Sequence, residues 1–283
     1  ILKLTDEDYN NNGMAKLVTE QGPAYAINIK IFNELQHTIT GWPGGKPGVD
    51  DSQRPERAEP ARKNVILFSP HPDDDVISMG GTFIRLADQG HNVHVAYQTS
   101  GNNAVWDDDA RRFLEFAQDI TKELGVDESN AYFKVKKPNQ MDPEIIRKVK
   151  AYIRKGEAIA GARLVGLPDS NIHFQDLPFY DRARIDKNVS YEDDIQQTME
   201  LIRQVKPHQI FAAGDFYDPN GTHKVCFDII LEALLRLRAT EEWAKDCWLW
   251  LYRGAWYEYP IHEIEMAVPL APQEVKRKRL AIF

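Results

Sequence analysis

The stretch LFSPHPDDDVISMGG, residues 67–81, joins an apolar run to a cluster of polar side chains. The run NVILF, residues 64–68, overlaps the start of this stretch. It predicts a short buried strand, which Pro70 ends. Helical spacing of apolar residues follows over 76–89, and Gly90 ends that helix. One histidine and three consecutive aspartates therefore stand between a buried strand and a helix.

Strands and helices alternate along the rest of the chain. Strand-like segments occur at 91–99, 171–177, 208–214 and 247–259, and helical spacing occurs at 107–124, 143–166, 191–205 and 222–237. This alternation predicts an α/β fold with a parallel or mixed sheet that helices cover on both faces. Ligands bind such folds at the carboxyl ends of the strands, where residues 71–75 are expected to lie.

The composition excludes several classes of protein. The chain has 283 residues and a net charge of −8, which argues against nucleic acid or an anionic membrane as a partner. No apolar stretch is long enough to span a bilayer, and no signal peptide is visible. The two cysteines, Cys226 and Cys247, form no metal-binding pair, and a reducing cytoplasm is the expected location.

The first 63 residues differ from the remainder. A helix is expected from about 22 to 36, and residues 41–63 are rich in Gly, Pro and charge, as in a linker or an extended arm. We therefore expect an N-terminal arm and linker over 1–63 and one domain over 64–283. The chain opens on Ile1, which we interpret as the start of a fragment or of a processed chain.

The polar cluster has the donors of a metal site. His71 and Asp74 follow one strand, His223 follows another, and zinc takes imidazole and carboxylate ligands while leaving a position open for water. Asp73 would then be the general base. The alternative is that the aspartates cap the following helix, although capping requires one aspartate and not three with a histidine.

These residues resemble a known family. SPHPDDDVISMGGT is similar to the signature of the LmbE-like, PIG-L deacetylases, and weaker similarities are YQTSGN at 97–102, RKGEAIAGARLVGL at 154–167 and HFQDLPF. The resemblance covers about residues 64–260, with 105–150 as an insertion. It implies a Rossmann-like layered sheet, mostly parallel, and a zinc-dependent enzyme that removes acetyl from N-acetylglucosamine groups. The expected partner is a small-molecule aminosugar, and a homo-oligomer is compatible with the sequence.

The resemblance also implies roles for individual residues. His71, Asp74 and His223 match the zinc ligands and Asp73 matches the general base. Arg154 gains a role in substrate contact from the match. Asp215 could bind sugar hydroxyls, and an ordinary structural role in a turn would explain this residue equally well.

Asn220 departs from the family pattern, which has a histidine there that helps to stabilise the intermediate and to protonate the leaving amine. Asparagine can donate a hydrogen bond to an oxyanion but cannot be a general acid. Two functions therefore remain: a metal-dependent deacetylase with activity weakened at Asn220, or a weakly active or non-catalytic carbohydrate-binding and regulatory module attached to an aminosugar enzyme. The stretches ILKLTDEDYN and GWPGGKP resemble the junction in bacterial proteins that join a glucosamine-6-phosphate deaminase-like domain to an LmbE-like domain.

The remaining features have structural explanations. His91, His94 and His173 lie on expected strands and are interpreted as structural, and Cys226 as a core residue. The basic run at 276–279 is expected at the exposed end of a C-terminal helix. The aromatic segment 247–259 is expected in the core or at a subunit contact, with stacking on a sugar as the minor alternative.

Overall fold

The computed structural model describes residues 12–28, 30–31, 62–123, 135–137, 140–182, 190–268 and 270–282. Residues 24–28 and 30–31 are helical, which agrees with the expected helix as far as it is described. The rest of that helix, and the linker up to residue 61, lie outside the described residues. The first strand begins at Asn64, where the sequence pattern places it.

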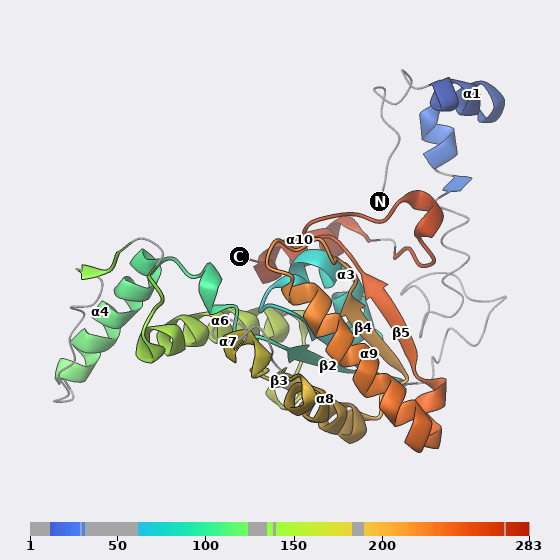
Figure 1. Cartoon of the computed structure of the whole chain (residues 1–283). Helices are drawn as coiled ribbons and strands as arrows, with labels where there is room; N and C mark the ends of the chain where they lie inside the picture. Colours follow the sequence, from blue (N-terminus) through green and yellow to red (C-terminus); the bar gives the residue numbers. More distant parts are fainter. Residues whose placement is uncertain are drawn as a thin grey trace.

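A five-stranded parallel sheet forms the centre of the molecule (Figure 1). Its strands are β1 (Asn64–Ser69), β2 (Asn92–Tyr97), β3 (Ile172–Phe174), β4 (Gln209–Ala213) and β5 (Trp248–Tyr252). They lie in the order β3-β2-β1-β4-β5, and every neighbouring pair is parallel. The predicted α/β class and its mostly parallel sheet are confirmed.

Helices connect these strands and cover both faces of the sheet (Figure 1). The helices are α1 (Asn12–Gln21), α3 (Asp74–Asp88), α4 (Asp107–Glu123), α6 (Glu144–Val165), α7 (Phe179–Arg182), α8 (Glu192–Val205), α9 (Thr222–Thr240) and α10 (Pro272–Ile282). Short 3-10 segments occur at Asn102–Ala104, Asp169–Asn171, Glu242–Asp246 and Ile261–Glu263.

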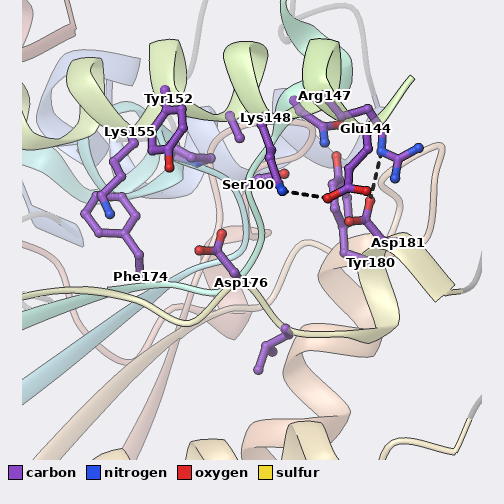
Figure 2. Close-up of a pocket in the computed structure, with 14 residues that line it drawn as sticks. Ser100, Glu144, Arg147, Lys148, Tyr152, Lys155, Phe174, Asp176, Tyr180 and Asp181 are labelled. Atoms are coloured by element: carbon purple, nitrogen blue, oxygen red, sulfur yellow. Dashed lines mark ion pairs between the residues drawn. The ribbon is translucent and has the colours of Figure 1, made fainter. Parts of the chain in front are cut away.

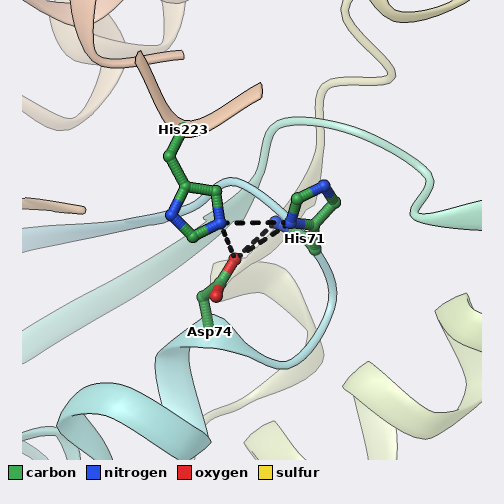
Figure 3. Close-up of side chains that lie close together, drawn as sticks. All are labelled: His71, Asp74 and His223. Atoms are coloured by element: carbon green, nitrogen blue, oxygen red, sulfur yellow. Dashed lines mark hydrogen bonds and ion pairs between the residues drawn. The ribbon is translucent and has the colours of Figure 1, made fainter. Parts of the chain in front are cut away.

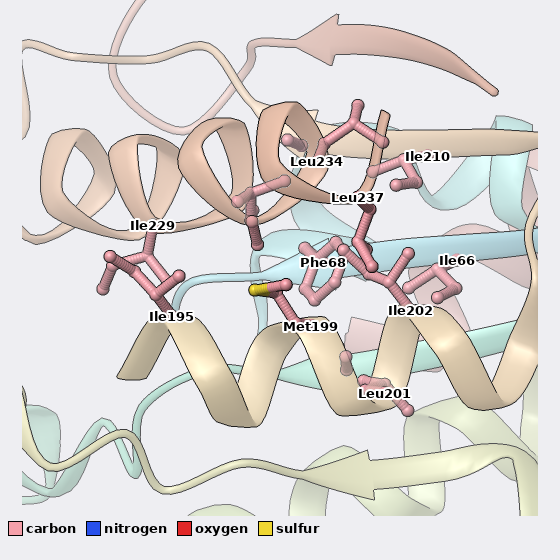
Figure 4. Packing of buried hydrophobic residues seen from close by; sticks show 14 of the residues in the cluster. Ile66, Phe68, Ile195, Met199, Leu201, Ile202, Ile210, Ile229, Leu234 and Leu237 are labelled. Atoms are coloured by element: carbon pink, nitrogen blue, oxygen red, sulfur yellow. The ribbon is translucent and has the colours of Figure 1, made fainter. Parts of the chain in front are cut away.

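Strand β1 separates two hydrophobic cores. Ile66 and Phe68 pack with α8 and α9 on one face (Figure 4), whereas Val65 and Leu67 pack with α3 and α6 on the other. Successive side chains of a strand point to opposite faces, so a strand that is apolar at every position must be buried on both sides. Residues 65–68 have this property, and their four side chains are fully buried.

The basic run 276–279 lies in the C-terminal helix α10, as predicted, and Lys276 and Arg279 are exposed. The helix also packs against α3 and α6, which the sequence did not predict. Arg277 pairs with Asp88 at 2.7 Å, and the stem of Lys278 lies against Gly80. Long basic side chains here cover apolar surface with their methylene stems, which the charge pattern alone does not reveal.

None of the described helices is both long and apolar enough to cross a membrane. Cys226 and Cys247 are both buried and unbonded to one another, so Cys226 is a core residue as expected.

Candidate functional site

The turn between β1 and α3 places four polar side chains at the carboxyl end of the central strand. Ser69 ends β1, and its buried hydroxyl donates to the carbonyl of His71 at 2.5 Å and accepts the amide of Asp75 at 3.1 Å. Asp73 occupies the N-cap position of α3, yet its side chain makes no capping hydrogen bond. Helix capping therefore does not account for the Asp73 carboxylate.

Three potential ligand side chains converge on one point (Figure 3). The carboxylate Oδ2 of Asp74 lies 3.3 Å from Nδ1 of His71 and 3.3 Å from Nε2 of His223, and these two nitrogens are 3.3 Å apart. Asp74 and His223 are buried, and His71 is half-buried. The structure thus brings together residues from the end of β1 and the start of α9, as the strand-end argument predicts.

These spacings match the donors of a tetrahedral metal site. Zinc binds imidazole nitrogen and carboxylate oxygen at about 2.0–2.2 Å, so neighbouring ligand atoms of a tetrahedron lie about 3.4 Å apart. All three distances in the cluster have nearly this value. Two imidazoles and one carboxylate also leave a fourth position for water, as catalytic zinc sites do. The residues present therefore fit a divalent cation.

The cluster is strongly coupled electrostatically. Burial opposes the ionisation of Asp74, but hydrogen bonds and charges from His223 and His71 outweigh it, so the pKa of Asp74 is held well below its usual range. For His223, burial disfavours the charged form, while the hydrogen bond to Asp74 and nearby carboxylates raise its pKa overall. Anionic Asp74 is thus available as a ligand at neutral pH.

Asp73, next to the ligand Asp74 in the turn, forms an ion pair with α6. Its Oδ2 lies 2.9 Å from Nη2 of Arg154, whose side chain is largely buried, and Asp73 itself is 37% exposed. The loop after β2 lies close against the turn. Gly101 has φ 60°, and a Cβ there would lie 2.7 Å from Cδ of Pro72. This close approach explains the glycine in the segment YQTSGN.

The residues after β4 have structural roles that the sequence did not predict. Asp215 is buried, and its Oδ2 accepts the backbone N–H groups of Trp256 at 2.7 Å and Tyr257 at 3.0 Å. These bonds hold the segment after β5, and the contact of Asp215 with sugar hydroxyls stays a prediction. Asp218 caps α9 by accepting the amides of Thr222 and His223, and Asn220 is exposed on the same turn.

A cavity of about 420 Å³ adjoins the cluster (Figure 2). Pro72 and Ser100 border it on the side of the turn, and the ring of Tyr180, which lines it, lies 6.3 Å from the ring of His71. Its remaining walls come from α6 and from the segment after β3 and carry charged and aromatic side chains: Glu144, Arg147, Lys148, Tyr152, Lys155, Phe174, Asp176 and Asp181. A mixed polar and aromatic lining suits a polar ring-shaped ligand.

Two functional candidates escaped the sequence reasoning. Asp176 lines the cavity and has φ 46°, a left-handed conformation that residues other than glycine rarely adopt. Backbone hydrogen bonds at Gln175 and Leu177 hold it there. The second candidate is Asp75, which is buried beneath the turn; burial raises its pKa to about 7, and the hydroxyl of Tyr97 donates to it at 2.8 Å. Their place in the segments that follow β3 and β1 was the available signal.

Known proteins of several kinds are similar to this chain. The PIG-L family model, described as GlcNAc-PI de-N-acetylase, matches residues 66–234. A glucosamine-6-phosphate deaminase-like protein of Bacteroides thetaiotaomicron is 51% identical over 294 residues, which cover 100% of this chain and 44% of that protein. The chain therefore spans less than half the length of this relative.

Two deacetylases are also similar. The diacetylchitobiose deacetylase of Thermococcus kodakarensis is 28% identical over 200 residues, covering 66% of this chain and 73% of that protein. Among solved structures, the N,N'-diacetylchitobiose deacetylase of Pyrococcus horikoshii, in complex with an inhibitor, has a TM-score of 0.47 and 19% identity, covering 90% of this chain and 79% of its own.

Proposed function

The chain belongs to the PIG-L family of de-N-acetylases, and on that premise we propose that it is a metal-dependent hydrolase that removes the N-acetyl group from an N-acetylglucosamine-type sugar. The observation that carries the proposal is the convergence of His71, Asp74 and His223, with 3.3 Å between each pair of ligand atoms. Asp73 stands beside this cluster without a capping role. A metal site, a base and an adjoining cavity are the parts that amide hydrolysis requires.

Zinc is the cofactor that these donors favour. Imidazole suits zinc and several transition metals, whereas magnesium and calcium prefer oxygen ligands throughout. When bound, a zinc ion supplies a Lewis acid that lowers the pKa of water and polarises a carbonyl. His71, Asp74 and His223 would hold it, and the hydrogen bond of the His71 amide to Asp74 Oδ2, at 2.9 Å, orients the carboxylate.

Asp73 is the proposed general base. Its side chain is next in sequence to the ligand Asp74 and is partly exposed, and Arg154 fixes its orientation through Oδ2. In this role Asp73 takes a proton from the attacking water and later returns that proton to the amide nitrogen as the acetyl group leaves. Arg154 keeps a positive charge beside the base, and its contact with the substrate stays a proposal.

The cavity beside the cluster is the proposed site for the sugar ring. Asp176 would accept hydrogen bonds from sugar hydroxyls, and its left-handed backbone conformation supports a functional role because such strain persists where the surroundings impose it. The Thermococcus relative is named for the deacetylation of diacetylchitobiose, which consists of two N-acetylated sugar units. This relationship supports an N-acetylated aminosugar as the substrate class.

Asn220 favours the second function, a carbohydrate-binding module with weak or no catalysis. An asparagine cannot deliver a proton to the departing nitrogen, so catalysis here depends on Asp73 for both proton transfers. The intact base nevertheless supports the hydrolase, because a binding module has no need of a carboxylate positioned by Arg154.

Acetate release from the zinc-loaded full chain tests the proposal. N-acetylglucosamine and N,N'-diacetylchitobiose are the substrates, and acetate and free amine are both measured. The wild type should release acetate and free amine in equal amounts. Asp73→Asn should release little of either product. The matched control is Asp228→Asn, which removes an exposed carboxylate of α9 that pairs with Lys224 and should leave the rate unchanged. Zinc binding without acetate release from any N-acetylated sugar would favour the binding module.

A further inference from the structure

Three exposed aromatic side chains gather where β4 and β5 end. Tyr217 is 68% exposed, Trp256 52% and Tyr257 55%, and the ring centroids of Tyr217 and Tyr257 lie 4.9 Å apart. We call Tyr217, Trp256 and Tyr257 the aromatic platform. Exposed aromatic groups of this size next to a functional site commonly mark a surface that binds a ligand.

A buried carboxylate holds the platform in place. Asp215, directly after β4, is 1% exposed, and its Oδ2 accepts the amides of both Trp256 and Tyr257. The neighbouring Arg253 donates through Nε to the carbonyl of Gly214 at 2.9 Å. Two backbone N–H groups that donate to one buried side-chain oxygen anchor the segment that carries two of the three aromatic side chains.

The same loop connects the platform to the metal ligands. Tyr217 follows Phe216, which turns inward and packs against Phe227 of α9 with ring centroids 5.0 Å apart. The next residue, Asp218, accepts the amides of Thr222 and His223. One short segment therefore presents Tyr217 to solvent and helps to position His223 in the cluster.

The strand order places the platform on the opposite side of the cluster from the cavity. The cavity is lined by residues that follow β2 and β3, such as Ser100 and Asp176. The cluster follows β1, at the centre of the order β3-β2-β1-β4-β5, and the platform follows β4 and β5. Cavity, cluster and platform thus lie in sequence along the carboxyl edge of one sheet, where ligands of such folds bind.

We propose that the aromatic platform binds a sugar ring of a saccharide whose N-acetyl group lies at the cluster, an inference that rests on the proposed function. Aromatic faces pack against the C–H face of a sugar ring, while the Tyr217 hydroxyl and the Trp256 indole N–H offer hydrogen bonds to its hydroxyls. The substrate is then an oligosaccharide or a glycoconjugate with at least one further sugar ring, and the platform gives no contact to a free monosaccharide.

Equilibrium binding to the full chain tests the platform. The parent protein carries Asp73→Asn so that the acetyl groups remain intact, and the probes are N,N',N''-triacetylchitotriose and N-acetylglucosamine. Tyr217→Ala and Trp256→Ala should each weaken trisaccharide binding about tenfold, as truncation of an aromatic anchor does, and leave monosaccharide binding unchanged. Tyr217→Phe, which keeps the ring, should retain most of the affinity.

Trp248→Ala is the matched control. Trp248 is 65% exposed but lies at the amino end of β5, whereas the platform follows the carboxyl ends of β4 and β5. Its replacement should therefore change neither the trisaccharide affinity nor the monosaccharide affinity. Equal trisaccharide affinity in the parent, Tyr217→Ala and Trp256→Ala proteins would overturn the inference. It would also be overturned if Tyr217→Ala altered the oligomeric state and left saccharide affinity unchanged, since the platform would then be a protein contact.

Deacetylation of N-acetylglucosamine by the wild type separates this inference from the proposed function. If the wild type deacetylates the monosaccharide and the platform variants bind the trisaccharide as tightly as the parent does, only the platform inference is contradicted. Trisaccharide binding that depends on Tyr217 and Trp256, without any turnover, supports the platform and contradicts the hydrolase.

Discussion

Arg154 of α6 and Asp73 of the β1–α3 turn form an ion pair, with 2.9 Å between Nη2 and Oδ2. The pair joins the helix that forms a wall of the cavity to the residue beside the proposed metal ligands. Because Arg154 is largely buried, its position is set by the packing of α6. Asp73 is thereby held as a carboxylate in one orientation, which a general base requires and a helix cap does not.

Asp73→Asn should separate metal binding from catalysis. Asparagine preserves the shape of the side chain and removes its basicity, so we expect the loss of about 10²–10⁴-fold in rate that general-base catalysis contributes. Bound zinc should stay at the wild-type stoichiometry, because Asp73 is not among the three converging ligands. Steady-state acetate release and metal analysis of the same sample measure both quantities. Loss of the metal together with the activity would make Asp73 a ligand and contradict its role as the base.

Asn220 should limit the rate of the wild type. Asn220→His supplies a group that can protonate the leaving amine and should raise kcat, whereas Asn220→Ala removes a hydrogen-bond donor. One such donor to an oxyanion is worth about 10²–10³-fold in kcat, so the alanine variant should be slower than wild type. The kcat values of the three proteins with one N-acetylated sugar provide the measurement. Equal values in all three would show that position 220 takes no part in catalysis.

Gly101 should be intolerant of a side chain and Gly156 tolerant. Gly101 has φ 60° and a Cβ there would lie 2.7 Å from Cδ of Pro72, next to the ligand turn, whereas Gly156 lies within α6 with open space around it. Gly101→Ala should therefore lower both the melting temperature and the zinc affinity. Gly156→Ala should raise the stability by about 0.5–1 kcal/mol, the usual gain on replacing a helical glycine. Thermal unfolding with and without zinc compares them, and equal effects would mean that the close contact at Pro72 has no consequence.

His94 and His173 should make the folded state less stable in acid. Their rings stack, with 2.9 Å between Nδ1 of His94 and Nε2 of His173. Burial, with the His173 charge, lowers the pKa of His94 to about 4, and burial also lowers the pKa of His173. The unfolded chain therefore binds more protons than the folded chain between about pH 6.5 and pH 4, and the free energy of unfolding falls as the pH falls through this window.

Urea unfolding of His94→Gln at several pH values tests this expectation. The variant should lose less stability than wild type between pH 7 and pH 4.5. His262→Gln is the control, because the His262 side chain is 81% exposed and its replacement should leave the slope unchanged. An unchanged slope in His94→Gln would show that the stacked pair does not oppose protonation.

The order of strands and helices was predictable because the strands of this sheet are short segments of β-forming residues and helical patterns lie between them. The end of β5 was not predictable from the sequence. The sequence suggested strand character as far as Tyr259, but β5 ends at Tyr252. Gly254 leaves the sheet with φ 155° and approaches Ser78 so closely that a Cβ would lie 3.1 Å from its Cα. This bend depends on a contact between distant segments, which apolar spacing does not encode.

The candidate site divides in the same way. The convergence of His71, Asp74 and His223 followed from motif spacing and from the rule that parallel strands present their carboxyl ends at one edge. The structural role of Asp215 did not follow from the sequence, because its partners are the backbone amides of Trp256 and Tyr257, which carry no side-chain signal. Asp176 was overlooked because its positive φ falls on a residue other than glycine. The two-part division of the chain at residues 63 and 64 stays a prediction.

Zinc stoichiometry and affinity, measured on the purified full chain and its variants after metal removal and reloading, test the central claim most directly. The account predicts one zinc ion per chain in the wild type, loss of that ion in His223→Ala and in Asp74→Ala, and retention in Asp73→Asn and in the surface control Asp228→Asn. Zinc binding of equal stoichiometry and affinity in the wild type and His223→Ala, or no specific zinc binding by the wild type, would contradict it.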